Sequence, residues 1–186
     1  MITVNVLKAD IAAGTTKPAD IEAMLATARL GSNVAAPLPV PFTLGYTGPF
    51  KSAGTMGGAY LYSRNGKLAP DAPEPGRAVF VVAPSHGHVN LDDIAQTSKA
   101  ALASLFDLGL GKITKEGPVT IAGLRGYEVE IDAPRKSPGP PTVAYQVILA
   151  TSDGGYMRML GTANFSEGIT LLPEFRKMAA SFQLAP

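Results

Sequence analysis

His86 and His88 are the only two histidines in the 186-residue sequence, and their His-x-His spacing could hold a metal ion. On a strand, residues two apart share a face, so both imidazoles could reach one zinc ion, with Asp92 and Asp93 just beyond. However, Gly87 and a preceding Pro-Ser pair favour a turn, and both aspartates suit the N-terminus of a following helix. We therefore expect a solvated connector without bound metal.

No other segment supplies a known catalytic pattern. The sequence has neither a Gly-x-Ser-x-Gly nor a His-Glu-x-x-His motif. Residues 109–112 (GLGK) are too short for a phosphate-binding loop, and residues 55–58 (TMGG) predict a loop or bulge before a strand. Glu128 and Glu130 share one face of a strand, but they alternate with apolar residues, which assigns them to the solvent side.

Tyrosines on predicted strands could combine with nearby arginines in an aromatic and cationic binding face. We favour the simpler interpretation, in which the tyrosines border the core and their hydroxyls reach water. Asn164-Phe165-Ser166 matches a glycosylation acceptor, a tripeptide that is common by chance. The sequence therefore assigns no catalytic, cofactor-binding or metal-ligating residue, and it leaves any ligand-binding residues unknown. The tyrosines and arginines considered above for an aromatic and cationic binding face are Tyr60, Tyr62, Tyr127, Tyr145, Tyr156, Arg125 and Arg158.

The composition predicts a folded domain that buries a core. Hydrophobic residues make up 46% of the chain and charged residues 17%. Sixteen basic residues against 15 acidic ones give a net charge of +1, which does not favour nucleic acid or an anionic membrane surface. Without cysteine there is no disulfide and no thiolate zinc site. We expect no transmembrane segment, and we expect that a signal or anchor has been trimmed before residue 1.

The first 41 residues predict an extension ahead of the main domain. Residues 2–7 have the β-branched alternation of a short strand. Residues 18–30 predict an amphipathic helix that begins at a proline and ends at Gly31. Residues 36–41 (APLPVP) predict an extended connector, and no role is assigned to residues 1–35.

Residues 42–186 predict a mostly antiparallel sheet with two helices. Asn90 is expected to cap a helix that runs to Phe106, and a second helix of roughly ten residues is expected to open near Pro173. Phe175 and Phe182 should face inward together. Strands are predicted at 42–46, 59–62, 77–83, 119–122, 127–132, 143–151 and 156–161, with turns at Asn65-Gly66, 123–126 and Asp153-Gly154.

Three stretches carry a resemblance to a known family. They are Val119–Val129 (VTIAGLRGYEV), the hairpin that ends at Gly155-Tyr156, and the run from Pro173-Glu-Phe175 to Ser181-Phe182. Together they resemble the Mog/PsbP-like family over roughly three-quarters of the chain. The resemblance implies an α+β fold with a single antiparallel sheet flanked by helices, an α/β/α sandwich. Residues 1–186 would then be one domain, with the PsbP-like core at 42–186.

The resemblance and the missing catalytic motifs predict a non-enzymatic binding or accessory domain of the bacterial cell envelope. It would be periplasmic or envelope-bound, although a cytoplasmic location stays open, and it would need no cofactor. The partner is a protein or a small ligand of unknown identity. The alternative is a small-ligand carrier with a pocket between sheet and helix, and a third reading is an enzyme whose acid–base pair meets only in the fold. A deep pocket lined by Tyr and Arg side chains would favour the carrier. A flat, exposed apolar patch would instead favour the binding of a protein partner.

Overall fold

The computed structural model describes residues 42–67, 78–85, 89–134 and 141–185. These residues lie in one compact unit, Val40–Pro186. Several predictions fall outside the described residues: the strand at 2–7, the helix at 18–30, the connector at 36–41, and the pair His86 and His88.

Seven strands form one antiparallel sheet in the order β2-β3-β4-β8-β7-β6-β5. A separate two-stranded sheet joins β1 (Phe42–Leu44) to β9 (Phe182–Leu184). The strands of the large sheet are β2 (Lys51–Met56), β3 (Ala59–Ser63), β4 (Val79–Ser85), β5 (Lys112–Ile121), β6 (Leu124–Asp132), β7 (Thr142–Ala150) and β8 (Tyr156–Asn164).

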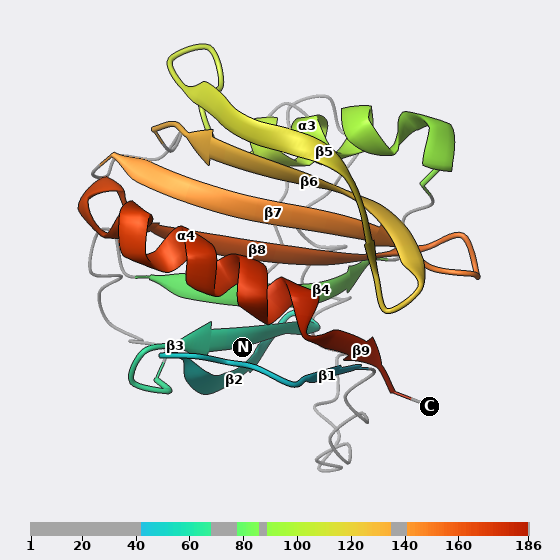
Figure 1. The fold of residues 1–186 in the computed structure, drawn as a ribbon, viewed down its shortest axis with the longest axis horizontal. Coiled ribbons are helices and arrows are strands. Elements are labelled where there is room, and N and C mark those ends of the chain that lie inside the picture. Colours follow the sequence, from blue (N-terminus) through green and yellow to red (C-terminus); the bar gives the residue numbers. More distant parts are fainter. Residues whose placement is uncertain (1–41, 68–77, 86–88, 135–140, 186) are drawn as a thin grey trace, which may run out of the picture. The chain divides into compact units, whose positions relative to one another are not determined.

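A helix covers each face of the large sheet. The short 3-10 helix η1 (Leu91–Asp93) leads into α3 (Ile94–Ala103), which packs on β6 and β7. The longer α4 (Phe165–Ala180) packs on β7 and β8 from the other side, as Figure 1 shows. The predicted α+β architecture, a mostly antiparallel sheet between helices, is confirmed.

The larger core lies between α4 and the sheet. Phe175 is fully buried, and its ring lies 5.9 Å from that of Phe80 on β4 and 5.4 Å from that of Phe50. Phe182 of β9 stacks on Phe42 of β1 at 5.6 Å. The rings of a closing helix, a central strand and the small sheet therefore form one apolar cluster.

The smaller core lies between α3 and the sheet. Asn90 begins this region as predicted, because its side chain accepts a hydrogen bond from the Asp92 backbone N–H. Leu102 and Phe106 are buried against Val129 and other apolar residues of β6 and β7. With a core on each side, both faces of the central strands are covered.

The closing helix is longer than predicted. It begins at Phe165 and runs for 16 residues, so Pro173 lies inside it and does not open it. Gly168 and Leu171, in the first turns, are buried, and this packing outweighs the hydrogen bond that the proline cannot donate. Phe182 is buried as predicted, but in β9 and not on the helix face that carries Phe175.

The β5–β6 turn, by contrast, is shorter than predicted. Ala122 and Gly123 both have positive φ, at 52° and 76°, so two residues close the hairpin. The stretch Leu124–Gly126, predicted as turn, therefore belongs to β6. The strand β2 was not predicted, and β1, predicted to extend to Tyr46, ends at Leu44 and pairs with β9.

Candidate binding site

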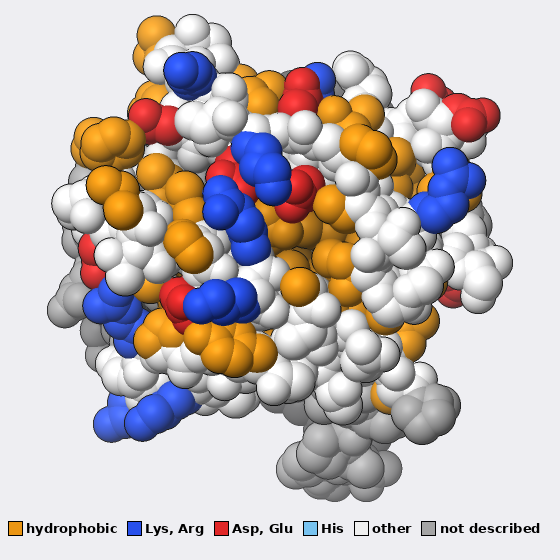
Figure 2. Space-filling view, in the orientation of Figure 1, with side chains coloured by type: hydrophobic (Ala, Val, Ile, Leu, Met, Phe, Trp, Pro, Cys, Tyr) orange, Lys and Arg blue, Asp and Glu red, His pale blue; other side chains and the backbone are white. Residues whose placement is uncertain are grey.

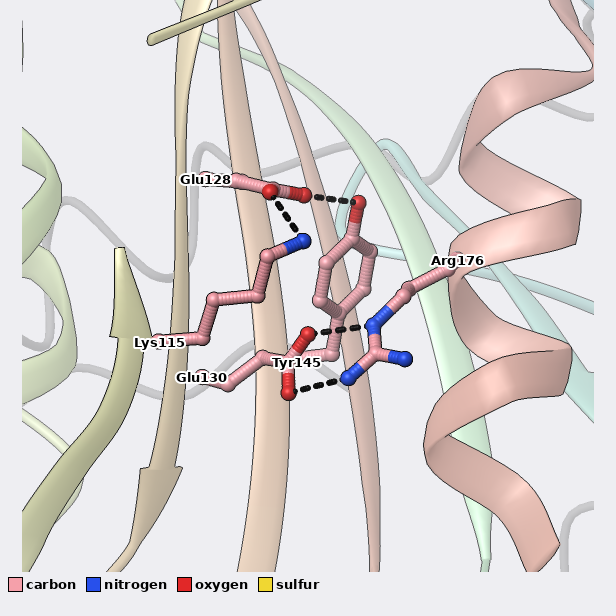
Figure 3. A network of polar contacts seen from close by, with 5 residues as sticks. All are labelled: Lys115, Glu128, Glu130, Tyr145 and Arg176. Carbon is pink, nitrogen blue, oxygen red and sulfur yellow. Dashed lines mark hydrogen bonds and ion pairs between the residues drawn. The ribbon is translucent and has the colours of Figure 1, made fainter. Parts of the chain in front are cut away.

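Glu128 and Glu130 point from β6 toward α4, which contradicts their predicted place on a solvent face (Figure 3). Glu130 is only 3% exposed, because α4 covers this side of the sheet. Arg176 of α4 holds it through two hydrogen bonds, from Nη2 to Oε2 at 2.6 Å and from Nε to Oε1. This bonding to the carboxylate raises the pKa of Arg176.

Glu128, two residues earlier on β6, is held by a cation and a phenol. Lys115 of β5 lies 2.6 Å from Glu128 Oε1, and the Tyr145 hydroxyl donates to Oε2 at 3.1 Å. Burial, and then the nearby Glu128 carboxylate, raise the pKa of Tyr145 well above its ordinary value. Each carboxylate therefore has a cationic partner, and the Arg176–Glu130 pair fastens α4 to the sheet.

A second polar network lies beneath α3. Gln146 of β7 donates from Nε2 to both the Oγ and the backbone oxygen of Ser98, at 2.8 Å each. Arg158 of β8 donates from Nε to Gln146 Oε1 at 2.8 Å and from Nη2 to the Ala101 carbonyl at 3.2 Å. Burial lowers the pKa of Arg158. The chain of hydrogen bonds thus joins helix, glutamine and arginine.

A pocket of about 370 Å³ opens on the α3 side of the sheet, between the start of that helix and the β5–β6 hairpin. This volume lies at the lower end of the range for small-molecule sites. Part of its wall is apolar, and Thr120, Arg125 and Tyr127 add polar groups. The lining residues are Leu91, Ile94, Pro118, Val119, Thr120, Arg125, Gly126 and Tyr127.

An ion pair lies beside the Tyr127 wall of this pocket. Lys99 of α3 reaches Glu116 of β5 at 2.8 Å. Hydrogen bonding to that lysine, with a smaller contribution from Tyr127, lowers the pKa of Glu116. Burial, and then Glu116, raise the pKa of Tyr127, so its hydroxyl stays protonated and able to donate.

The five strand tyrosines do not share one binding face. The register of the sheet divides them between its two sides, and the buried Tyr145 donates its hydroxyl to the Glu128 carboxylate. Tyr60, Tyr62 and Tyr145 belong to the α4 side, whereas Tyr127 and Tyr156 lie on the α3 side with Arg125 and Arg158. The sequence alone did not indicate which arginine would meet which tyrosine.

The outer surface of α4 carries an exposed apolar pair. Phe165 is 55% exposed and Ile169 is 91% exposed, and a spacing of four places them on one helix face. Figure 2 views the molecule from the α4 side, where hydrophobic side chains lie among acidic and basic ones. Glu167, two residues from each member of the pair, forms a separate ion pair with Arg64 at 3.0 Å.

Within the described residues, no group of three His, Asp, Glu or Cys side chains could hold a metal ion. His86 and His88 are outside that range, so the sequence-based expectation about them stays a prediction. No described helix has both the length and the apolar character needed to cross a membrane.

A seven-stranded antiparallel sheet with one helix on each face defines the class of fold, and comparison with solved structures identifies it as Mog/PsbP-like. LpqN of Mycobacterium tuberculosis, described as involved in cell envelope biogenesis, matches with a TM-score of 0.57 and 14% identity, over 78% of this chain and 83% of LpqN. The Ran-binding protein Mog1p of Saccharomyces cerevisiae matches with a TM-score of 0.51 and 11% identity, over 77% of this chain and 90% of Mog1p. No family model and no curated protein sequence matches the chain. At these identities the likeness establishes the fold alone.

Proposed function

We propose that the chain is a non-enzymatic accessory domain of the bacterial cell envelope that acts by binding a protein. The observation that carries this proposal is the apolar pair Phe165 and Ile169, exposed on a helix whose other face is firmly docked. Large apolar side chains that remain in water at adjacent helical positions mark sites of protein contact. The description of LpqN as an envelope biogenesis protein supports the location, and that of Mog1p as Ran-binding supports a protein partner.

The carboxylates argue against catalysis. A general acid or base needs a proton-carrying group that can reach a substrate. Glu130 is enclosed and paired with Arg176, and Glu128 is paired with Lys115 and bonded by Tyr145. These groups are therefore placed to hold the fold together.

The protein-binding proposal can be tested by photo-crosslinking in the native cell. A benzophenone amino acid at Phe165 should give an adduct of discrete mass, and adding Ile169→Ser should remove that adduct while the melting temperature stays the same. The matched control is the same photoreactive residue at Thr43, an exposed position on β1. Equal adducts at both positions, or none at Phe165, would contradict a docking site on α4. Fractionation of the same cells tests the location, and recovery of the native protein in the cytosol alone would contradict it.

A second function, the carrying of a small ligand, is favoured by the pocket between α3 and the β5–β6 hairpin. It has the combination expected of a carrier site, because Arg125 and Tyr127 stand beside the apolar Leu91 and Ile94. Native mass spectrometry of the purified protein tests it through a co-purified small molecule. Replacing Ile94 with the larger Phe should then reduce the bound fraction.

A further inference from the structure

We infer that the pocket between α3 and the β5–β6 hairpin selects a small amphipathic anion, a carboxylate or phosphate attached to a short apolar group. The anionic group would pair with Arg125, and the apolar group would lie against Leu91, Ile94 and Pro118. This inference rests on the second proposed function, the small-ligand carrier, and adds the chemical class of the ligand.

Arg125 is the cation of this pocket. Among the ion pairs of the described residues, none engages Arg125, whereas Arg64, Lys99, Lys115, Arg176 and Lys177 each have a carboxylate partner. A guanidinium has five N–H donors in a planar fork that matches the oxygens of a carboxylate or a phosphate. An exposed arginine that lines a cavity and forms no ion pair within the described part of the chain is therefore available to an external anion.

The surrounding wall explains why the ligand should be amphipathic and not a bare ion. An ion pair with a guanidinium in open water contributes little free energy, so a free inorganic anion would bind weakly. Leu91 and Ile94 from the helical side and Pro118 from β5 supply apolar surface next to Arg125. Burying a short hydrocarbon group there removes apolar area from water and so strengthens binding.

The acidic groups of the region do not line the pocket. Asp92 and Asp93 are exposed in η1, and neither is among the lining residues. Glu116 is neutralised by Lys99 at 2.8 Å. The Tyr127 hydroxyl stays protonated and is bonded to Glu116, so it adds no negative charge to the lining. The balance of charge at the lining therefore favours an anion.

The test uses three probes that share a six-carbon chain: hexanoate, hexyl phosphate and the neutral hexanol. Isotope-labelled protein is titrated with each at low ionic strength, and the NMR signals of Ile94, Arg125 and Tyr127 are followed. We expect saturable shifts with at least one of the two anions, and comparison of hexanoate with hexyl phosphate shows which anionic group the pocket prefers. Hexanol should bind roughly tenfold more weakly or worse, because it lacks the charge-assisted hydrogen bond.

Three variants complete the test. Arg125→Gln should lower the affinity for the anions roughly tenfold while leaving hexanol unchanged, and Arg125→Lys should restore part of the loss. Arg64→Gln, at an exposed arginine that does not line the pocket, is the matched control and should not change binding. All three substitutions are at exposed positions, and an unchanged spectrum elsewhere confirms that each variant is folded. If hexanol binds as tightly as the anions, the anion selectivity is wrong but the carrier function stands. If none of the probes gives saturable shifts at millimolar concentration, the inference and the carrier function both fail.

Discussion

The ring of Phe175 lies directly on Gly161, so that a Cβ at this glycine would overlap the ring atoms. Phe175 comes from α4 and Gly161 from the middle of β8, and both are buried. The missing side chain creates the space in which the closing helix approaches the sheet. On the same side of the sheet, Arg176 pairs with Glu130, so an apolar and an ionic contact together fix one helix.

Gly161→Ala should therefore destabilise the protein by about 1–3 kcal/mol, because the added methyl group forces Phe175 away from the sheet. Gly117→Ala on β5 is the matched control, since a Cβ there meets no atom within 4 Å. Its free energy of unfolding should stay within about 0.5 kcal/mol of the wild type. Urea denaturation measures both variants. Equal effects would mean that α4 does not pack on β8 as described.

Phe175→Ala and Phe182→Ala should each lower the free energy of unfolding by about 3–5 kcal/mol, because each removes a fully enclosed ring. Lys177→Ala, at an exposed residue, should change stability by less than about 0.5 kcal/mol. Glu174 accepts hydrogen bonds from both Tyr46 and Lys177. The loss of stability for Glu174→Ala should therefore be larger than that for Lys177→Ala and smaller than that for either phenylalanine variant. Denaturation curves that are the same for all four variants would contradict a docked C-terminal segment.

The Glu130–Arg176 pair should respond asymmetrically to mutation. Arg176→Met leaves a buried carboxylate without a counter-ion and should cost about 3–5 kcal/mol. Glu130→Gln should cost less, because the Arg176 side chain is 40% exposed and remains solvated. The double variant should recover part of the loss of Arg176→Met, as a double-mutant cycle in urea would show. If Glu130→Gln is the more damaging change, the carboxylate is not as enclosed as the structure indicates.

Gln146→Leu should destabilise the protein by about 1–3 kcal/mol, because Arg158 loses an acceptor in a partly buried setting. Ser98→Ala should cost less, since the Gln146 amide keeps its bond to the Ser98 backbone oxygen. Thermal denaturation of the two variants compares them directly. A larger loss of stability for Ser98→Ala than for Gln146→Leu would show that the Ser98 hydroxyl contributes more to this network than the Gln146 amide.

The pKa of Glu174 provides a pH-dependent test. Bonding to Tyr46, and then to Lys177, lowers this pKa below the ordinary value of about 4.3. A carboxyl whose pKa is lowered by folding stabilises the native state above its unfolded pKa, and this stabilisation is lost as the pH falls through the folded pKa. Tyr46→Phe should move the NMR-measured pKa of Glu174 upward and reduce the loss of stability below about pH 4.3. Tyr60→Phe is the control, and an equal shift in both variants would show that Tyr46 does not set this pKa.

The His-x-His pair gives a prediction that comes from the sequence alone. His86→Ala combined with His88→Ala should leave the melting temperature almost unchanged, because two histidines cannot complete a tetrahedral zinc site. Elemental analysis of the purified wild type should find no stoichiometric metal. One zinc per chain, lost in the double variant, would reverse this interpretation.

The sequence by itself determined the features that depend on local spacing. Alternation identified the central strands, Asn90 marked the first turn of the α3 region, and Asp153-Gly154 marked a hairpin. These signals are local because side-chain periodicity and turn geometry depend on residues within a few positions of each other. Short stretches of the same local sequence supported the resemblance to the Mog/PsbP-like fold.

Only the tertiary structure decided what covers each face of the sheet. Glu128 and Glu130 alternate with apolar residues, as on a half-exposed strand, yet α4 lies over them and supplies Arg176 46 positions along the chain from Glu130. The early start of α4 at Phe165, ahead of Pro173, likewise depends on burial of Leu171 against the sheet. Contacts between residues this far apart in the chain cannot be predicted from local periodicity, because the burial of a residue depends on the helix or strand that packs against it. For the same reason, the meeting of Arg125 with the start of α3 around one pocket could not be read from the chain.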